Sequence, residues 1–328
     1  MKIIFMGSAE FACPALELLL KTRRDEIAGV VSQPERPSGR HQKNKKCPVD
    51  ELASSKSLPV LTPENINTPE SVESLRALKP DLIAIVAYGQ ILKVDILALA
   101  PKGCINLHGS LLPKYRGAAP IQWAVASGEQ KTGVTTMFIN EKMDAGDIIS
   151  RDEELILPDD TSVSLGGRLA DKGARLLIGT IEMIRRGAAP SEKQNEALAT
   201  YAPRLKKTDG LIDWTRPAAE LSNRIRGFLP WPSCYFILKN KSTVRVLRAQ
   251  VEADGPAAPG TILEARGKGP LIQTGAGSLR LMEVQPEGRK PMSGNAFLCG
   301  NKMDEGGRLT SACPALDAVA RQWTTPPR

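Results

Sequence analysis

The chain has 328 residues, of which 41% are apolar and 24% charged, and this length and composition are typical of a globular protein with two domains. No run approaches the roughly 18 apolar residues of a membrane-spanning helix, and the N-terminus MKIIFMG has the pattern of a strand rather than of a signal peptide, so we expect a cytoplasmic protein with no membrane partner. The net charge of +8 arises entirely from Arg204 onward, where 19 Lys and Arg outnumber 11 Asp and Glu. Such an excess favours either solubility or the binding of a polyanion such as nucleic acid.

The first 150 residues alternate predicted strands with predicted helices. Apolar runs predict strands at 2–7, 27–33, 58–63, 81–88, 103–110 and 134–140, and helical patterns lie between them at 13–22, 48–56 and 69–80. This alternation predicts a parallel sheet with helices on both faces, which binds ligands beyond the carboxyl ends of its strands. The first turn, FMGSAEF, lacks G-x-G-x-x-G, and no Walker motif occurs, so we expect no dinucleotide cofactor.

The second half of the chain changes character. A helix predicted at 161–187 is followed by a polar segment rich in Ala and Pro, then by a helical pattern at 218–228 and short strands with Gly-rich turns that predict a small all-β barrel. We therefore expect an α/β domain at 1–189, a linker at 190–206, an all-β domain at 207–309 and a tail of unknown role at 310–328. The six cysteines form no C-x-x-C pair, so we expect free thiols and no metal site.

The stretch CINLHGSLLPKYRGAAP, from Cys104 to Pro120, contains one of only two histidines. Asn106 and His108 are two residues apart on a predicted strand, so both side chains share a face and can donate hydrogen bonds to a carbonyl oxygen that gains negative charge. A carboxylate that orients the imidazole would complete such a site. Asp144 is the best candidate, because it sits in a Gly-containing loop just past another predicted strand, and Asp147 is the alternative. The spacing alone somewhat favours the alternative of a hydrogen-bonded core histidine and a turn-forming aspartate. No G-x-S-x-G motif supports a serine nucleophile.

The segment INLHGSLLPKYRGAAPIQWA resembles the signature of the 10-formyltetrahydrofolate-dependent formyltransferases. Its RGAAP portion, from Arg116 to Pro120, resembles the branch of this family that acts on methionyl-tRNA. The resemblance covers roughly residues 1 to 309. Further matches, in the same order along the chain, are MGSAEF, QPERPSGR, AYGQIL, MDAGDII, DGLIDW, IRGFLPWP and PGTILEA.

The resemblance implies a Rossmann-like catalytic domain and a C-terminal barrel of OB type that assists tRNA binding. It assigns the catalytic triad to Asn106, His108 and Asp144, and it assigns the folate site to the turn Ser110, Leu111, Leu112 and Pro113. The formyl donor would be 10-formyltetrahydrofolate, with no metal, and the acceptor the methionine of initiator methionyl-tRNA. The implied tRNA acceptor loop contains the basic residues Arg36, Arg40, Lys43, Lys45 and Lys46. We expect a monomer.

Two other functions remain open on the sequence. A related enzyme could formylate a small amine, such as glycinamide ribonucleotide or an amino-sugar nucleotide, because these relatives share the Asn-His-Asp core. The basic loop at 36–46 and the basic C-terminal domain favour tRNA, since a small acceptor needs neither. A tRNA-binding protein without activity is the second alternative, and the presence of Asn106, His108 and Asp144 disfavours it.

Overall fold

The computed structural model describes residues 1–38 and 43–310. The predicted loop residue Arg40, and the expected tail from residue 311 on, lie outside the described residues. The chain divides into two compact units. Unit 1 combines residues 1–121, 130–157 and 164–204, and unit 2 combines residues 122–129, 158–163 and the chain from Leu205 onward.

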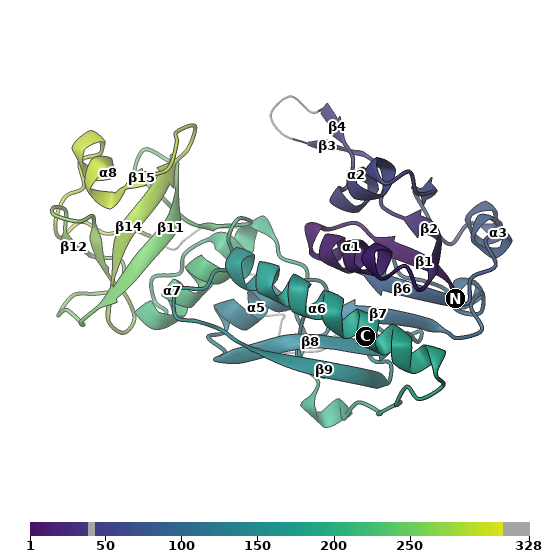
Figure 1. The fold of residues 1–328 in the computed structure, drawn as a ribbon. Coiled ribbons are helices and arrows are strands. Elements are labelled where there is room, and N and C mark those ends of the chain that lie inside the picture. The colour runs from purple at the N-terminus through teal and green to yellow at the C-terminus, as the bar shows by residue number, and fades with distance from the viewer. Residues whose placement is uncertain (39–42, 311–328) are drawn as a thin grey trace. The chain divides into compact units, whose positions relative to one another are not determined.

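A seven-stranded sheet forms the centre of unit 1, in the order β5-β2-β1-β6-β7-β8-β9 (Figure 1). The strands are β1 (Lys2–Gly7), β2 (Glu26–Val31), β5 (Val60–Leu61), β6 (Leu82–Val86), β7 (Cys104–His108), β8 (Lys131–Phe138) and β9 (Ile148–Leu155). The five strands from β5 to β7 are parallel, whereas β8 and β9 are antiparallel to their neighbours. The expected α/β sheet is confirmed, but its wholly parallel form is wrong.

The short connection between β8 and β9 explains why these two strands are antiparallel to each other. Only residues 139–147 join these strands, and a parallel crossover needs about a dozen residues or more. The strand β9 was not predicted because it turns polar after its first residues, and only Ile148 and Ile149 in it are buried. By contrast, β1 is buried in five of its six residues, as expected for a central strand covered on both faces.

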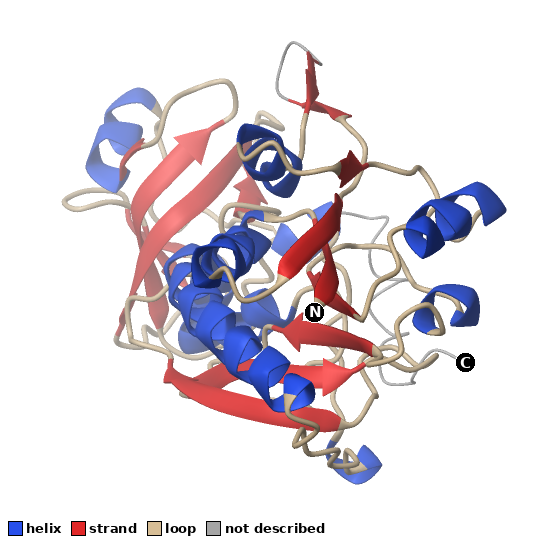
Figure 2. Cartoon of the chain, turned by 45° about the vertical axis from the view of Figure 1, so that its right-hand side comes forward, coloured by secondary structure: helices blue, strands red, loops and turns tan. Residues whose placement is uncertain are grey.

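Helices cover both faces of this sheet, as predicted. They are α1 (Cys13–Thr22), α2 (Pro48–Ser55), α3 (Pro69–Ala77), α4 (Val94–Leu97) and α6 (Ser162–Arg185). A core cluster joins Ile4, Ile83 and Cys104 of the strands to α3 and α4 on one face. The helix α6 runs along the other face (Figure 2), where a Cβ at Gly173 would lie 2.8 Å from Leu107 of β7, so this glycine allows the close approach.

The predicted helices of unit 1 begin at or within one residue of their observed starts and end within three residues of their observed ends. Sequence reasoning missed α4, the short helix α5 (Pro120–Ala126) and a hairpin of β3 (Arg36–Ser38) with β4 (Lys43–Lys45). This hairpin stands beside α2 in Figure 1. The basic loop predicted at 36–46 is therefore built on two paired strands.

Unit 2 contains an antiparallel sheet in the order β10-β11-β14-β13-β12, with β15 paired to β14. Its elements are α7 (Ala218–Gly227), β10 (Cys234–Ile237), β11 (Thr243–Glu252), β12 (Ile262–Glu264), β13 (Leu271–Gln273), β14 (Ser278–Pro286), β15 (Met292–Ser293) and α8 (Gly294–Gly300). The antiparallel β domain is confirmed. No described pairing joins β10 to β12, so closure into a barrel stays a prediction. Within the described ranges, none of the helices is both long and apolar enough to cross a bilayer.

Candidate active site

The strand β7 carries Asn106 and His108 to the carboxyl end of the parallel sheet. Cys104, two residues before Asn106, belongs to the core on the α3–α4 face, so the alternation of a strand puts Asn106 and His108 on that same face. His108 is only 6% exposed. Asn106 is half-buried, and within the described part of the chain its carboxamide makes no hydrogen bond, so a ligand can use both of its polar groups. Burial raises the pKa of the Cys104 thiol to about 12, so this neighbouring thiol is a poor nucleophile.

The structure brings Asp144, rather than Asp147, to the histidine. The Oδ2 atom of Asp144 lies 3.7 Å from Nδ1 of His108, within ion-pair distance but beyond a hydrogen bond. The side chain of Asp147 instead accepts a hydrogen bond of 2.7 Å from the hydroxyl of Ser191. Asp144 adopts a φ of 49°, in the left-handed region that is costly for residues other than glycine. This conformation belongs to the tight loop between β8 and β9.

The loop that follows β7 returns to the same two side chains. The carbonyl oxygen of Tyr115 lies 2.9 Å from Nε2 of His108. Because a carbonyl only accepts, Nε2 carries the hydrogen in this contact, and Nδ1 is the nitrogen left facing Asp144. The backbone N–H of Gly117 donates a hydrogen bond of 2.8 Å to the Asp144 carboxylate. Gly117 has a φ of 124°, and a Cβ there would lie 2.6 Å from the carbonyl oxygen of Ala202, so no other residue fits without strain.

The predicted folate turn, from Ser110 to Pro113, is held by internal contacts. The hydroxyl of Ser110 donates to the carbonyl of Lys114 at 2.6 Å, and the backbone N–H of Leu112 donates to the hydroxyl of Thr135 at 3.1 Å. Ser110 is fully buried, and Leu112 packs against Met137 and Ile148. Only Leu111 and Pro113 of the four residues are partly exposed. These two side chains are the ones that a flat ligand could contact.

The basic residues of the predicted tRNA loop differ in whether they already have an ion-pair partner within the protein. Arg36 pairs with Glu64 at 2.9 Å, and Lys46 pairs with the nearly buried Asp50 at 3.1 Å, so both have internal partners. Lys45 is exposed, and the backbone of Lys43 pairs with that of Ser38 across the hairpin. Arg40 lies outside the described residues.

Two basic residues of unit 2, the part of the chain that carries the excess positive charge, are engaged in its own packing. The guanidinium of Arg224 lies 4.9 Å from the ring of Phe228 and 5.9 Å from that of Trp123, and burial lowers its pKa. Arg226 donates hydrogen bonds to the carbonyl of Asp160 and to the side chain of Asn223. Neither is a free phosphate ligand. In contrast, Lys241, Arg245 and Arg248 are exposed.

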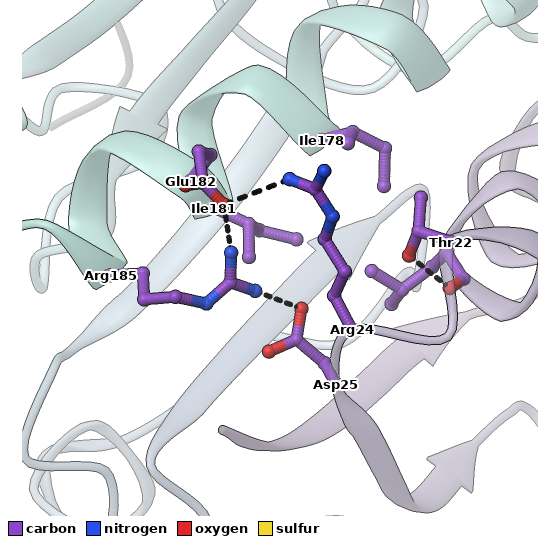
Figure 3. Close-up of a pocket in the computed structure, with 8 residues that line it drawn as sticks. Thr22, Arg24, Asp25, Ile178, Ile181, Glu182 and Arg185 are labelled. Atoms are coloured by element: carbon purple, nitrogen blue, oxygen red, sulfur yellow. Dashed lines mark hydrogen bonds and ion pairs between the residues drawn. The ribbon is translucent and has the colours of Figure 1, made fainter.

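A separate cavity of about 390 Å³ lies between α1, α6 and the start of β2 (Figure 3). Its charged groups already pair with one another: Arg185 contacts both Asp25 and Glu182, and Arg24 contacts Glu182. Asp25 precedes β2, so this cavity lies at the amino ends of the strands, whereas His108 lies at the carboxyl ends. Its paired charges and apolar lining offer no group for acyl-transfer chemistry.

Sequence reasoning missed two residues that contact the site, Gln194 and Glu196. Both lie in the segment predicted at 190–206 to be a linker, of which residues 190–204 belong to unit 1. The carboxamide of Gln194 bonds to the backbone of the Asp144 loop and to Arg116, which also pairs with Glu196. This polar segment shows no periodicity, so no signal in the sequence could have identified them.

Comparison with known families finds two matching models. Residues 1–181 match the model described as formyl transferase, and residues 204–302 match the one described as formyl transferase, C-terminal domain. The methionyl-tRNA formyltransferase of Geobacter sulfurreducens is 45% identical over 312 residues, which cover 95% of this chain and 98% of the relative. That of Desulfotalea psychrophila is 49% identical over 304 residues, covering 92% of this chain and 94% of the relative.

Solved structures share the fold at lower identity. WlaRD, a sugar 3N-formyl transferase determined in the presence of dTDP and 5-N-formyl-THF, has a TM-score of 0.65 at 19% identity and covers 88% of this chain and 99% of its own. HypX from Aquifex aeolicus in complex with tetrahydrofolic acid has a TM-score of 0.59 at 16% identity and covers 94% of this chain and 50% of its own. At such identities the likeness concerns the fold alone.

Proposed function

This chain belongs to the methionyl-tRNA formyltransferases, and on that premise we propose that it transfers the formyl group of 10-formyltetrahydrofolate to the α-amino group of methionine on initiator tRNA. The enzyme is a formyltransferase of a family that uses folate formyl donors. The reaction takes place in the cytoplasm, where the charged tRNA is used for translation.

The observation that carries the proposed mechanism is the meeting of His108 with Asp144 at the strand end that also bears Asn106. The 3.7 Å separation between Nδ1 of His108 and Oδ2 of Asp144 is long for a catalytic contact, and such contacts often tighten when substrate binds. Asn106 supplies a donor on the same strand face. A carbonyl group bound at this strand end would lie near the carboxamide of Asn106, the imidazole of His108 and the carboxylate of Asp144.

The acceptor needs positioning more than activation. A free α-amine has a pKa of about 8, so a useful fraction is already the neutral nucleophile at neutral pH. Its attack on the formyl carbon forms the new C–N bond and places a negative charge on the formyl oxygen. The carboxamide N–H of Asn106 stabilises this oxyanion, an effect worth about 100- to 1000-fold in rate for a single donor.

His108 moves the proton between the two nitrogens. Its Nε2–H is held by the carbonyl of Tyr115, so Nδ1 accepts the proton of the new ammonium. The Asp144 carboxylate stabilises the imidazolium that results. Nδ1 then passes the proton to N10 of the folate as the C–N bond to the donor breaks. Protons and charges are balanced, because the product amide loses the proton that the tetrahydrofolate gains.

The two substrates use different surfaces in this proposal. The partly exposed Leu111 and Pro113 contact the folate next to the formyl group. The β3–β4 hairpin with its loop contacts the acceptor end of the tRNA, through Arg40 and Lys45. The basic residues of unit 2 bind phosphates, which adds affinity but little sequence information.

The test is a formyl-transfer assay with four acceptors: charged initiator tRNA, charged elongator methionine tRNA, glycinamide ribonucleotide and an amino-sugar nucleotide. We expect turnover with the initiator tRNA and preference for it over the other three. Transfer to a small amine alone would contradict the acceptor assignment. No transfer to any of them by folded protein would contradict the activity itself.

A further inference from the structure

We propose that Gln194 is a positioning residue for formyl transfer, which holds the loop of Asp144 so that its carboxylate faces His108. The inference rests on the proposed function, because it concerns the same reaction at the same site. None of the hydrogen bonds described for Gln194 goes to His108; they go to Arg116, to Met137 and to the Asp144 loop. It comes from the segment that leaves α6, far from both β7 and Asp144 in the sequence.

The carboxamide of Gln194 uses both of its N–H groups on the Asp144 loop. Its Nε2 atom donates to the carbonyl oxygen of Asp144 at 2.9 Å and to that of Gly146 at 2.8 Å. Gln194 is only 9% exposed, so water cannot readily replace these bonds. Without them, the buried carbonyl of Gly146 and the partly buried carbonyl of Asp144 would lose this donor.

The other end of the carboxamide is fixed by Arg116. Its Oε1 atom accepts hydrogen bonds from Nε of Arg116 at 3.1 Å and from Nη2 at 2.8 Å. The same guanidinium pairs with both carboxylate oxygens of Glu196, each at 2.9 Å, and is 3% exposed. The hydrogen bond with Glu196 raises the pKa of Arg116, so it stays charged despite its burial. We call Arg116, Gln194 and Glu196 the Gln194 network.

Arg116 also connects the network to the catalytic side chains through its two neighbours in the chain. The carbonyl of Tyr115 contacts His108, and the N–H of Gly117 contacts the Asp144 carboxylate. The backbone of Arg116 itself pairs with residues 200 and 202, downstream of Gln194. One guanidinium therefore anchors the loop that holds His108, and through Gln194 it anchors the loop that bears Asp144.

The conformation of Asp144 explains why its loop needs this support. Its left-handed φ of 49° is less favourable than a right-handed conformation for a residue with a Cβ. The bonds from Gln194 to carbonyls 144 and 146 hold the backbone on both sides of Ala145. When they are removed, the loop can relax to a conformation that turns the carboxylate away from His108. A displacement of about 1 Å in a catalytic group can cost on the order of 100-fold in rate.

The principal variant is Gln194→Glu. It has nearly the same shape and keeps acceptors for Arg116, but it removes the two donors to the Asp144 loop. Gln194→Met, which removes both sets of bonds, is the second variant, and Lys193→Ala is the matched control, since Lys193 is the exposed neighbour outside the network. For Gln194→Glu we expect kcat to fall about 10- to 100-fold. The KM values for both substrates should stay within about twofold, because Gln194 is only 9% exposed and its hydrogen bonds are to other groups of the protein.

A double-variant cycle distinguishes positioning from general damage. If Gln194 acts through the Asp144 carboxylate, Gln194→Glu should have almost no further effect on kcat in an Asp144→Asn background. Equal losses in both backgrounds, or an unchanged kcat for folded Gln194→Glu and Gln194→Met, would overturn the inference. Wild-type turnover with initiator tRNA is the reference in every assay. If the wild type did not turn over with initiator tRNA, the proposed function would be wrong. If the wild type did turn over but the effects of Gln194→Glu and Asp144→Asn on kcat were additive, only the role of Gln194 would be wrong.

Discussion

In the described part of each unit, a buried arginine bonds to two acidic or amide side chains, and we expect the two arginines to have different roles. Arg116 in unit 1 is 3% exposed and bonds to Gln194 and Glu196. Arg280 in unit 2 is 8% exposed and bonds to Glu252 and Glu264. The local chemistry is nearly the same, since a planar guanidinium satisfies several acceptors at once.

The difference lies in what the partners are attached to. Glu252 ends β11, Glu264 ends β12 and Arg280 lies on β14, so that cluster joins three strands of one sheet. The partners of Arg116 instead hold two loops around His108. The charge cluster in unit 2 therefore joins strands, while we propose that the one in unit 1 maintains a catalytic geometry. The comparison predicts that substitutions in the unit 1 cluster lower activity, whereas substitutions in the unit 2 cluster lower the free energy of unfolding.

The largest effect should come from the catalytic side chains of unit 1. Replacing His108 by Ala removes the proton carrier, and Asp144→Asn removes the charge that stabilises it, so each should lower kcat by about 100-fold or more. The matched control is Asp147→Asn, whose carboxylate bonds to Ser191 instead. Steady-state kinetics with charged initiator tRNA measure this. Near-normal turnover by His108→Ala would exclude the histidine from the mechanism.

Arg280→Met should cost stability without changing the chemistry. Breaking a buried pair leaves carboxylates without their partner, but Glu252 and Glu264 are 30% and 40% exposed and can regain water. We therefore expect a loss of about 2 kcal/mol, less than for a fully buried pair. Urea denaturation measures it, with kcat corrected for the folded fraction. Arg116→Met, by contrast, should lower the kcat of the folded protein. Equal corrected kcat values for Arg116→Met and Arg280→Met would contradict the proposed difference between the two arginines.

Removal of exposed basic residues from unit 2 should weaken tRNA binding while kcat stays unchanged. We expect Lys241, Arg245 and Arg248, all changed to Gln, to raise the KM for tRNA about tenfold at low salt, because the variant neutralises fewer phosphates and releases fewer counterions.

The slope of log affinity against log salt should become shallower by about 0.7 to 0.9 for each phosphate that the variant no longer neutralises. A charge-matched control changes Lys21, Lys56 and Lys102, which are exposed at the amino ends of the unit 1 strands. If the control variant raises the KM for tRNA equally, the effect comes from the net charge of the protein and not from the surface of Lys241, Arg245 and Arg248.

The smallest effect concerns Glu196, which is 69% exposed and so contributes little to the network. The hydrogen bond from Arg116 lowers the pKa of Glu196 below its usual value of 4.5. Its contribution is therefore present at neutral pH and is lost only as the pH falls through that lowered pKa. We expect Glu196→Gln to lower kcat by no more than about twofold, by the same factor from pH 6 to 8. Denaturation curves of the two proteins should converge in acid. If the ratio of the wild-type kcat to that of Glu196→Gln changed between pH 6 and 8, a group other than Glu196 would be responsible for the effect.

Much of unit 1 could be predicted because its signals are local. Five buried apolar residues in β1 and the spacing of helices such as α3, capped by Thr68, are encoded within a few neighbouring residues. The polar β9 and the β3–β4 hairpin could not be predicted, since their pairing partners rather than their own composition stabilise them. The side of the sheet that Asn106 and His108 share also followed from the two-residue alternation of a strand.

The sequence by itself determined the family resemblance, the strand that carries Asn106 and His108, and the excess of positive charge from Arg204 onward. Only the tertiary structure bonded Asp147 to Ser191, placed Arg224 against two aromatic rings and brought Gln194 to the site. The physical reason is distance along the chain. A residue's type and its near neighbours fix its local conformation, but its hydrogen-bond partners depend on which remote segments the fold brings together. Gln194 lies 50 residues from Asp144 and 78 from Arg116, and only the folded chain makes the three neighbours.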